Sequence, residues 1–218
     1  MANNVHSYIE FVEINDAAKA KLVEMFGKCA EMEYGRRWFG HMFTNEELSP
    51  EDTEKYEWTT DVIGPKWCYI EDSDVTPDTE TPYMVMDSAW APPSTGLQNL
   101  LEVLAELDPN MITSITYEDE MPNFVGWEVY VGSEMEDCCE DDYDEIKERI
   151  FEENPNLKEH WSESDDDWMT DEETGDYTEE AEQAQDEFRD ILYESISDWN
   201  SEGVADCIRF ITENREEA

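Results

Sequence analysis

The side chains that could do chemistry in this sequence are overwhelmingly carboxylates. The 218 residues include 59 Asp and Glu against 13 Lys and Arg, for a formal net charge of -46. With so many acids, a neighbouring pair of carboxylates carries almost no information about acid–base catalysis. His6, His41 and His160 are far apart and show no metal-ligand spacing, and no Gly-rich nucleotide loop or nucleophile elbow is present. The sequence therefore predicts a protein that is not an enzyme and that holds no cofactor.

Calcium is the inorganic ligand that the acids would suit best. Residues 72–78, Asp-Ser-Asp-Val-Thr-Pro-Asp, begin like an EF-hand loop, but Pro77 stands where the loop needs Gly and Tyr83 where it needs Glu. A second acidic loop, which begins at Asp165, fails at the same two positions. We therefore expect no specific metal site, and only weak, diffuse binding of divalent cations.

The negative charge increases along the chain. The net charge is -3 over residues 1–50, -9 over 51–100, -14 over 101–150 and -20 over 151–218. Such charge excludes direct electrostatic binding to nucleic acid or to an anionic membrane. Disorder is not implied, because disordered acidic chains are poor in aromatic residues and this chain is 39% hydrophobic and 12% aromatic.

The sequence favours the cytoplasm of a host cell as the compartment. No apolar run approaches the roughly 18 residues of a membrane-spanning helix, and residues 1–7 contain no basic or apolar signal region. The five cysteines are odd in number, and two are adjacent, Cys138 and Cys139. Free thiols in a reducing environment are the simplest interpretation.

The first 132 residues alternate strand and helix patterns. The predicted elements are a strand over 6–14, a helix capped by Asp16, strands over 67–70 and 83–89, a helix over 94–107, and strands over 112–117 and 124–131. This order predicts an α+β fold: a ferredoxin-like plait, with helices on one face of an antiparallel sheet, as a first domain over residues 1–132. Trp38 and Trp90 are interpreted as packing residues rather than binding anchors.

Three motifs in this domain resemble the phage and plasmid family with a YubB-type ferredoxin-like domain. They are Gly64-Pro-Lys-Trp67, Ser88-Ala-Trp-Ala-Pro-Pro93 followed by a Leu-rich helix, and Tyr117-Glu-Asp-Glu with Phe124-Val-Gly-Trp127. The first motif departs from the family's Gly-Thr-Lys-Trp at Pro65. The resemblance covers roughly residues 1–132 and implies a ferredoxin-like fold and an origin in a mobile element. The family has no established activity, so no catalytic residue is carried over.

Residues 133–218 are predicted to form an acidic helical extension packed on the first domain. Residues 142–153 and 178–199 show helical spacing of apolar positions, and Ser201 is suited to cap a last helix. We expect the last two helices to form a hairpin.

Residues 134–187 carry enough charge to imitate a short DNA duplex. They contain 25 acids and three bases, while a duplex as long as a protein of this size, about 40–50 Å, holds roughly 24–29 phosphates. We therefore expect an acidic DNA mimic from a phage or mobile element that binds and inhibits a basic host DNA-binding protein, such as a restriction or CRISPR effector, a nucleoid protein or RNA polymerase. A homodimer is compatible with this role. The candidate partner-binding residues are Glu140, Asp141, Asp142, Asp144, Glu145, Asp165, Asp166, Asp167, Asp171, Glu172, Glu173, Glu179, Glu180, Glu182, Asp186 and Glu187.

Two other interpretations fit the composition. One is an acidic, non-enzymatic chaperone or assembly module for basic proteins, and the other is a soluble protein adapted to high salt.

Overall fold

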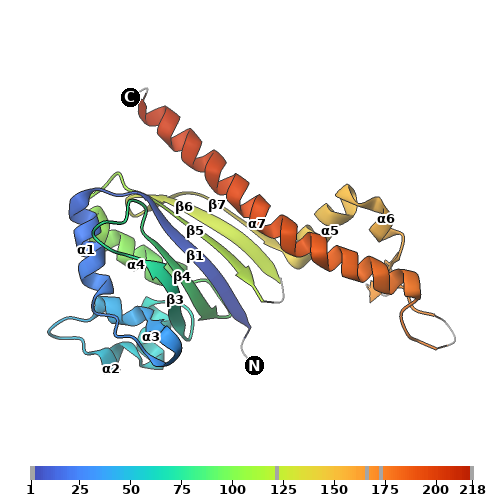
Figure 1. Ribbon diagram of the computed structural model, residues 1–218, viewed down its shortest axis with the longest axis horizontal. Coiled ribbons are helices and arrows are strands. Elements are labelled where there is room, and N and C mark those ends of the chain that lie inside the picture. The colour runs from blue at the N-terminus through green and yellow to red at the C-terminus, as the bar shows by residue number, and fades with distance from the viewer. Residues whose placement is uncertain (1–2, 121–122, 165–166, 172–173, 217–218) are drawn as a thin grey trace. The chain divides into compact units, whose positions relative to one another are not determined.

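The computed structural model describes residues 3–120, 123–164, 167–171 and 174–216. The chain divides into two compact units: residues 1–140 with 203–218, called here the sheet unit, and residues 141–202, called here the helical unit. The secondary structure confirms an α+β fold, with a seven-stranded antiparallel sheet and a long C-terminal helix (Figure 1). Within the described residues, no helix combines the length and apolarity that crossing a bilayer requires.

The sheet is centred on β1 and runs in the order β2-β3-β4-β1-β5-β6-β7. Each side of β1 pairs antiparallel with a neighbour: Ile9 lies opposite Met84 on one side and Ile115 on the other. The strands are β1 (Asn4–Glu13), β2 (Arg37–Trp38), β3 (Cys68–Asp74), β4 (Tyr83–Ala89), β5 (Ile112–Asp119), β6 (Phe124–Val131) and β7 (Glu134–Asp142).

The larger hydrophobic core lies between one face of the sheet and helices α1 (Asp16–Phe26) and α4 (Ser94–Ala105). Helix α4 buries Leu97, Leu100, Leu101 and Leu104, the stripe that the sequence predicts. Asn15, not the predicted Asp16, caps α1, because its side-chain oxygen accepts a hydrogen bond from the Ala18 amide. Four short elements complete this side: η1 (Glu33–Gly35), η2 (Phe39–Phe43), α2 (Pro50–Thr53) and α3 (Tyr56–Val62).

The predicted helical hairpin at the C-terminus is wrong, because residues 179–216 form one continuous helix, α7 (Glu179–Glu216). Residues from 203 onward belong to the sheet unit, where Val204, Cys207 and Ile211 pack with Ile112 and Val129 in a second, smaller core. Ile112 and Ile115 lie three positions apart on β5 and therefore on opposite faces of the sheet, and Ile112 belongs to this core while Ile115 belongs to the larger one. The sheet thus buries apolar side chains on both faces.

Gly203 lies inside helix α7, near the position where the sequence suggests a helix cap. A Cβ atom at this position would lie 2.4 Å from Nε1 and 2.6 Å from Cε2 of the Trp127 indole. The glycine therefore permits a close approach of helix α7 to strand β6, and it does not mark a helix end.

The prediction that residues 124–131 form the last strand is also wrong, because β7 extends the sheet by one more strand. The tight turn before it uses Gly132 at a positive φ of 58°, and the Gly132 amide donates to the Met111 carbonyl. Residues 134–140 are all exposed, so β7 shows none of the apolar alternation that identifies a strand in sequence. The sheet unit consequently includes residues beyond the boundary near residue 132 that the sequence suggested.

The helical unit is built around an aromatic cluster. Phe151 and Trp168 contact each other, and each also contacts Trp161 and Phe188, with ring centroids 5.4–6.2 Å apart. Besides the first part of α7, the unit contains α5 (Tyr143–Glu153), α6 (Pro155–Lys158) and the two-stranded pair β8 (Trp161–Ser162) and β9 (Asp167–Trp168). Residues 142–153, predicted as a helix, thus correspond to α5. β9 lies within the acidic loop that begins near Asp165, and β8 precedes that loop.

We predict that Gly203→Ala destabilises the protein. Replacing Gly by Ala inside an exposed helix normally stabilises it by roughly 0.5–1 kcal/mol, but here the new methyl group would displace the Trp127 indole, and overpacking typically costs about 1–3 kcal/mol. Urea denaturation of both proteins measures the difference. Glu213→Ala, at an exposed position of the same helix, is the control, and a gain of stability in Gly203→Ala would contradict the close approach.

Candidate partner-binding surface

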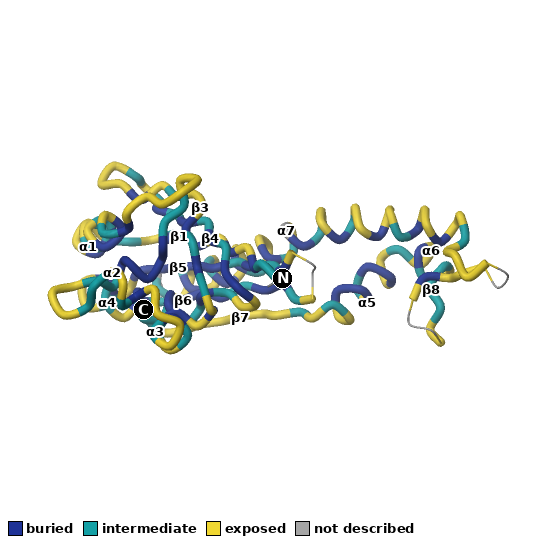
Figure 2. The backbone as a smooth tube through the Cα atoms, turned by 90° about the horizontal axis from the view of Figure 1, so that it is seen from below, coloured by how far each residue is buried: buried dark blue, intermediate teal, exposed yellow. Residues whose placement is uncertain are grey.

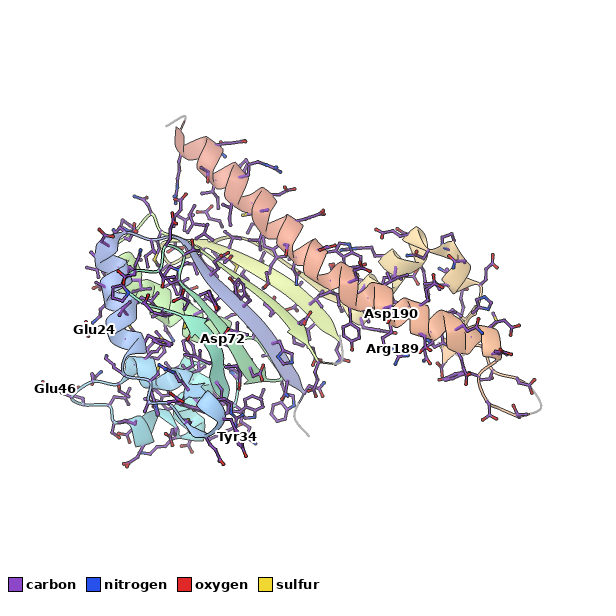
Figure 3. The ribbon with its side chains drawn as sticks, viewed as in Figure 1. Glu24, Tyr34, Glu46, Asp72, Arg189 and Asp190 are labelled. Carbon is purple, nitrogen blue, oxygen red and sulfur yellow. The ribbon has the colours of Figure 1, made fainter. Side chains whose placement is uncertain are left out.

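A long regular array of carboxylates lies on helix α7 within the helical unit. Between residues 179 and 202 the helix carries nine acids, all exposed, called here the acidic helix face: Glu179, Glu180, Glu182, Asp186, Glu187, Asp190, Glu194, Asp198 and Glu202. The same 24 residues contain a single base, Arg189, which donates to Asp186. Figure 2 shows buried and exposed residues alternating within the turns of this helix, and Figure 3 labels Arg189 and Asp190.

Apolar packing on the opposite side of the helix holds these carboxylates in place. Ala181, Ala184, Phe188, Leu192 and Ile196 are buried and recur at spacings of three and four, as the sequence predicts. The helix continues for fourteen residues beyond Glu202. Acids late in the predicted helix thus lie in mid-helix, where the unfavourable interaction with a C-terminal dipole is absent.

Two cations of α5 also stabilise the helical unit. The Lys147 side chain is only 7% exposed, and its ammonium lies 2.9 Å from an Asp144 carboxylate oxygen and 4.8 Å from the Trp161 ring centroid. The Arg149 guanidinium donates to Asp141 at 2.5 Å and stacks over Trp199 at 4.4 Å. These two cations are paired with carboxylates inside the unit. Residues 141–202 contain 25 acids and only four bases, so the unit keeps a large negative charge.

Several candidate carboxylates near α5 cap the helix or form ion pairs within the chain. Asp142 caps α5 by accepting from the Glu145 amide at 3.0 Å, and the Glu145 carboxylate accepts from the Asp142 amide at 3.0 Å. Together with the pairs made by Asp141 and Asp144, these contacts place four of the predicted residues in interactions within the chain. The structure does not bring them onto the acidic helix face, which instead includes the predicted residues Glu179, Glu180, Glu182, Asp186 and Glu187.

The acidic loop between α6 and α7 is described in part. The Tyr177 hydroxyl donates to the Asp167 carboxylate at 3.1 Å, and an Asp171 side-chain oxygen accepts from the Thr174 amide at 3.0 Å. The other candidates in this loop, Asp165, Asp166, Glu172 and Glu173, lie outside the described residues.

Glu140, the remaining candidate, lies in the sheet unit beside a small pocket of about 190 Å³. The pocket is lined by Trp90, Ala91, Pro92, Phe124 and Glu140, and the Tyr117 hydroxyl donates to the Glu140 carboxylate at 3.0 Å. The predicted packing role is correct for Trp38, which is 6% exposed and donates to the Thr53 carbonyl. For Trp90 it is wrong, because this residue is 55% exposed and has a positive φ of 65°.

A larger groove of about 360 Å³, between β7 and the last part of α7 in the sheet unit, was not anticipated. It is lined by Trp127, Glu136, Asp137, Gly203, Asp206, Cys207, Phe210 and Ile211. The sequence reasoning missed Glu136 and Asp137 because it did not place a strand after Val131. The signal was the two-residue connection Gly132-Ser133, which is typical of a β-hairpin.

Comparisons with protein-family models, curated proteins and solved structures find no match to this chain. Among the described residues, no group of three or more His, Cys, Asp and Glu side chains has the geometry of a metal site.

We predict that stability falls at alkaline pH because buried phenols must ionise on unfolding. The hydroxyls of Tyr117 and Tyr130 donate to Glu140 and Glu128, and burial, followed by these carboxylates, raises the pKa of both phenols above the ordinary value of about 10. Burial likewise raises the pKa of the Cys29 thiol from about 9 to about 12. The stabilisation is complete below about pH 9 and decreases as pH rises toward the folded-state pKa values.

Urea denaturation between pH 8 and 11.5 measures this loss. Each raised pKa contributes up to about 1.4 kcal/mol per pH unit above the unfolded-state value, so Tyr130→Phe should flatten the decline above pH 10. Tyr193→Phe, at an exposed tyrosine, should leave it unchanged. The same slope in the wild-type and Tyr130→Phe proteins would contradict the assignment.

Proposed function

We propose that this chain is a non-enzymatic acidic protein of a phage or other mobile element that imitates the charge of duplex DNA. It binds a basic DNA-binding protein of the host, such as a restriction or CRISPR effector, a nucleoid protein or RNA polymerase, and occupies its DNA groove. The observation that carries the proposal is the acidic helix face, with nine exposed carboxylates fixed on one helix.

The spacing of these carboxylates supports the comparison with DNA. At 1.5 Å per residue, the 24 residues from 179 to 202 span about 36 Å, so the face presents about one carboxylate per 4 Å. A single strand of duplex DNA presents one phosphate per roughly 3.4 Å of helix axis. A basic groove built to contact a phosphate strand would therefore meet a similar linear density of charge, held at fixed positions by the helix.

The chain has too few cations to neutralise its acids, with 13 Lys and Arg against 59 Asp and Glu. Most of its 13 Lys and Arg side chains are already paired with a carboxylate, for example Lys21 with Glu24, Lys55 with Asp52 and Arg209 with Asp206. The excess of -46 is thus available to attract a cationic partner over long range, which accelerates association at low salt.

A mobile-element origin rests on the resemblance of residues 1–132 to the YubB-type family and on the proposed plait. Elements β1–α1–β3–β4–α4–β5 follow the βαββαβ order of a ferredoxin-like chain. Strands β3, β4, β1 and β5 are successive neighbours, and every pair is antiparallel. In this proposal the inserted short helices, β6, β7 and α7 are additions to the plait.

The proposal predicts that the protein, immobilised at about 0.15 M salt, retains a DNA-binding protein from a bacterial lysate and releases it to duplex DNA. Mass spectrometry identifies the retained protein, and lysozyme and histones are passed over the same column. Selective capture with release by DNA supports the proposal. Equal retention of lysozyme and histones supports the chaperone interpretation instead, and capture of no DNA-binding protein overturns the mimic.

Two matched variants test the role of the acidic helix face. One changes Glu180, Glu182, Glu187, Glu194 and Glu202 to Gln. The control changes five exposed acids of the sheet unit to Gln: Glu31, Glu33, Glu46, Glu47 and Glu57. Since an exposed charge pair contributes about 0.2–1 kcal/mol, the first variant should bind the captured protein at least about fivefold more weakly and the control much less so. Equal weakening would show that total charge, rather than this face, determines binding.

A protein adapted to high salt is distinguished by its folding. Such a protein should lose helical circular dichroism at about 0.01 M salt, where the Debye length reaches roughly 30 Å and its carboxylates repel one another unscreened. A DNA mimic held together by its apolar cores should retain the signal.

A further inference from the structure

The groove between β7 and the last part of α7 differs from the acidic helix face because its floor is apolar. Trp127 of β6 and Cys207 and Ile211 of α7 line it, and Cys207 and Ile211 are each less than 10% exposed. Phe210 also lines the groove, yet its side chain is 68% exposed. A large aromatic side chain left in water beside an apolar hollow is typical of a surface that a partner covers.

The rim of the groove is acidic. Glu136 and Asp137 of β7 lie on one side, and Asp206 of α7 lies on the other. Burial, followed by the charges of Asp137 and Glu136, raises the pKa of the Cys207 thiol, which places these carboxylates near the floor. An anionic ligand is disfavoured by this rim, and a purely apolar ligand would leave the carboxylates without a counter-charge.

We propose that this groove binds an arginine side chain of the basic partner, an inference that rests on the proposed function and adds a specific contact to it. A guanidinium group is planar, stacks on aromatic rings and forms paired hydrogen bonds with carboxylates. Trp127 and Phe210 supply the rings, and Glu136 and Asp137 supply the carboxylates. The volume of about 360 Å³ accommodates one such side chain together with its alkyl stem.

Charge and planar shape together favour arginine over the other occupants. Lysine carries the same charge but lacks the planar group that stacks on an indole and contacts two carboxylates at once. Asp206 is paired with Arg209 of the same helix, so an incoming guanidinium would find its acceptors chiefly on β7. The site lies entirely in the sheet unit and is separate from the acidic helix face.

The test uses N-acetyl-argininamide as the probe and N-acetyl-citrullinamide, which has nearly the same shape but no charge, as its control. The full-length protein is labelled with ¹⁵N, and the Trp127 indole N–H resonance is assigned by its loss in Trp127→Phe. We expect the arginine probe to shift this resonance saturably, with a dissociation constant on the order of millimolar, and the citrulline probe to bind at least about fivefold more weakly.

Charge variants then test the rim. Glu136→Gln with Asp137→Asn should weaken binding of the arginine probe at least about threefold. The control, Glu46→Gln with Glu47→Gln, removes two adjacent exposed acids elsewhere in the sheet unit and should leave binding unchanged. Both variants are compared with the wild-type protein by their remaining indole resonances, which report whether the fold is intact.

Three results would overturn the proposal: no shift of the Trp127 resonance at about 50 mM probe, well above the expected millimolar dissociation constant; equal shifts with the citrulline probe; or equal weakening by both pairs of substitutions. The outcome is independent of the lysate experiment because no partner protein is present. Arginine binding without capture of a DNA-binding protein would overturn the proposed function alone, and capture without arginine binding would overturn only this groove contact.

Discussion

Mutual repulsion among carboxylates is the constraint that the rest of this structure must overcome. A net charge of -46 on 218 residues opposes any compact state. The sheet unit offsets it by burying apolar side chains on both faces of one sheet, and the helical unit does so with four interlocked aromatic rings. Some of the acids also stabilise the fold directly, since Asp52 and Asp142 take part in capping boxes at helix N-termini.

The sequence was most informative where apolar residues repeat regularly. The boundaries of β4 and β6 and the buried stripe of α4 follow directly from such patterns. Strand β7 escaped prediction because it is a terminal strand with acids on both faces, and no periodicity separates such a strand from a loop. The continuous helix escaped prediction because Ser201 and Gly203 are typical of a helix boundary, whereas here the absent side chain of Gly203 makes room for Trp127.

The candidate surface was predictable in composition but not in detail. Counting charges located the acidic region, yet it could not distinguish a carboxylate that caps a helix, such as Asp142, from one that is presented to solvent, such as Glu187. That distinction depends on backbone amides and cations within a few ångströms, which only the folded arrangement brings together. The same limitation hid the groove, whose residues come from the consecutive strands β6 and β7 and from the last part of α7, which is distant from them in sequence.

Charge and shape have different roles in a mimic of DNA. A row of exposed carboxylates attracts any basic protein, because long-range electrostatics accelerates association and discriminates weakly between partners. Discrimination requires a contact whose energy depends on exact fit, and such contacts are usually buried aromatic or arginine anchors within a polar rim. An acidic helix face by itself would therefore behave like a general binder of cations. The apolar groove on the sheet unit offers the kind of feature that a selective mimic additionally needs, since the proposed contact of Trp127 and Phe210 with a guanidinium would depend on the shape and charge of the partner's side chain.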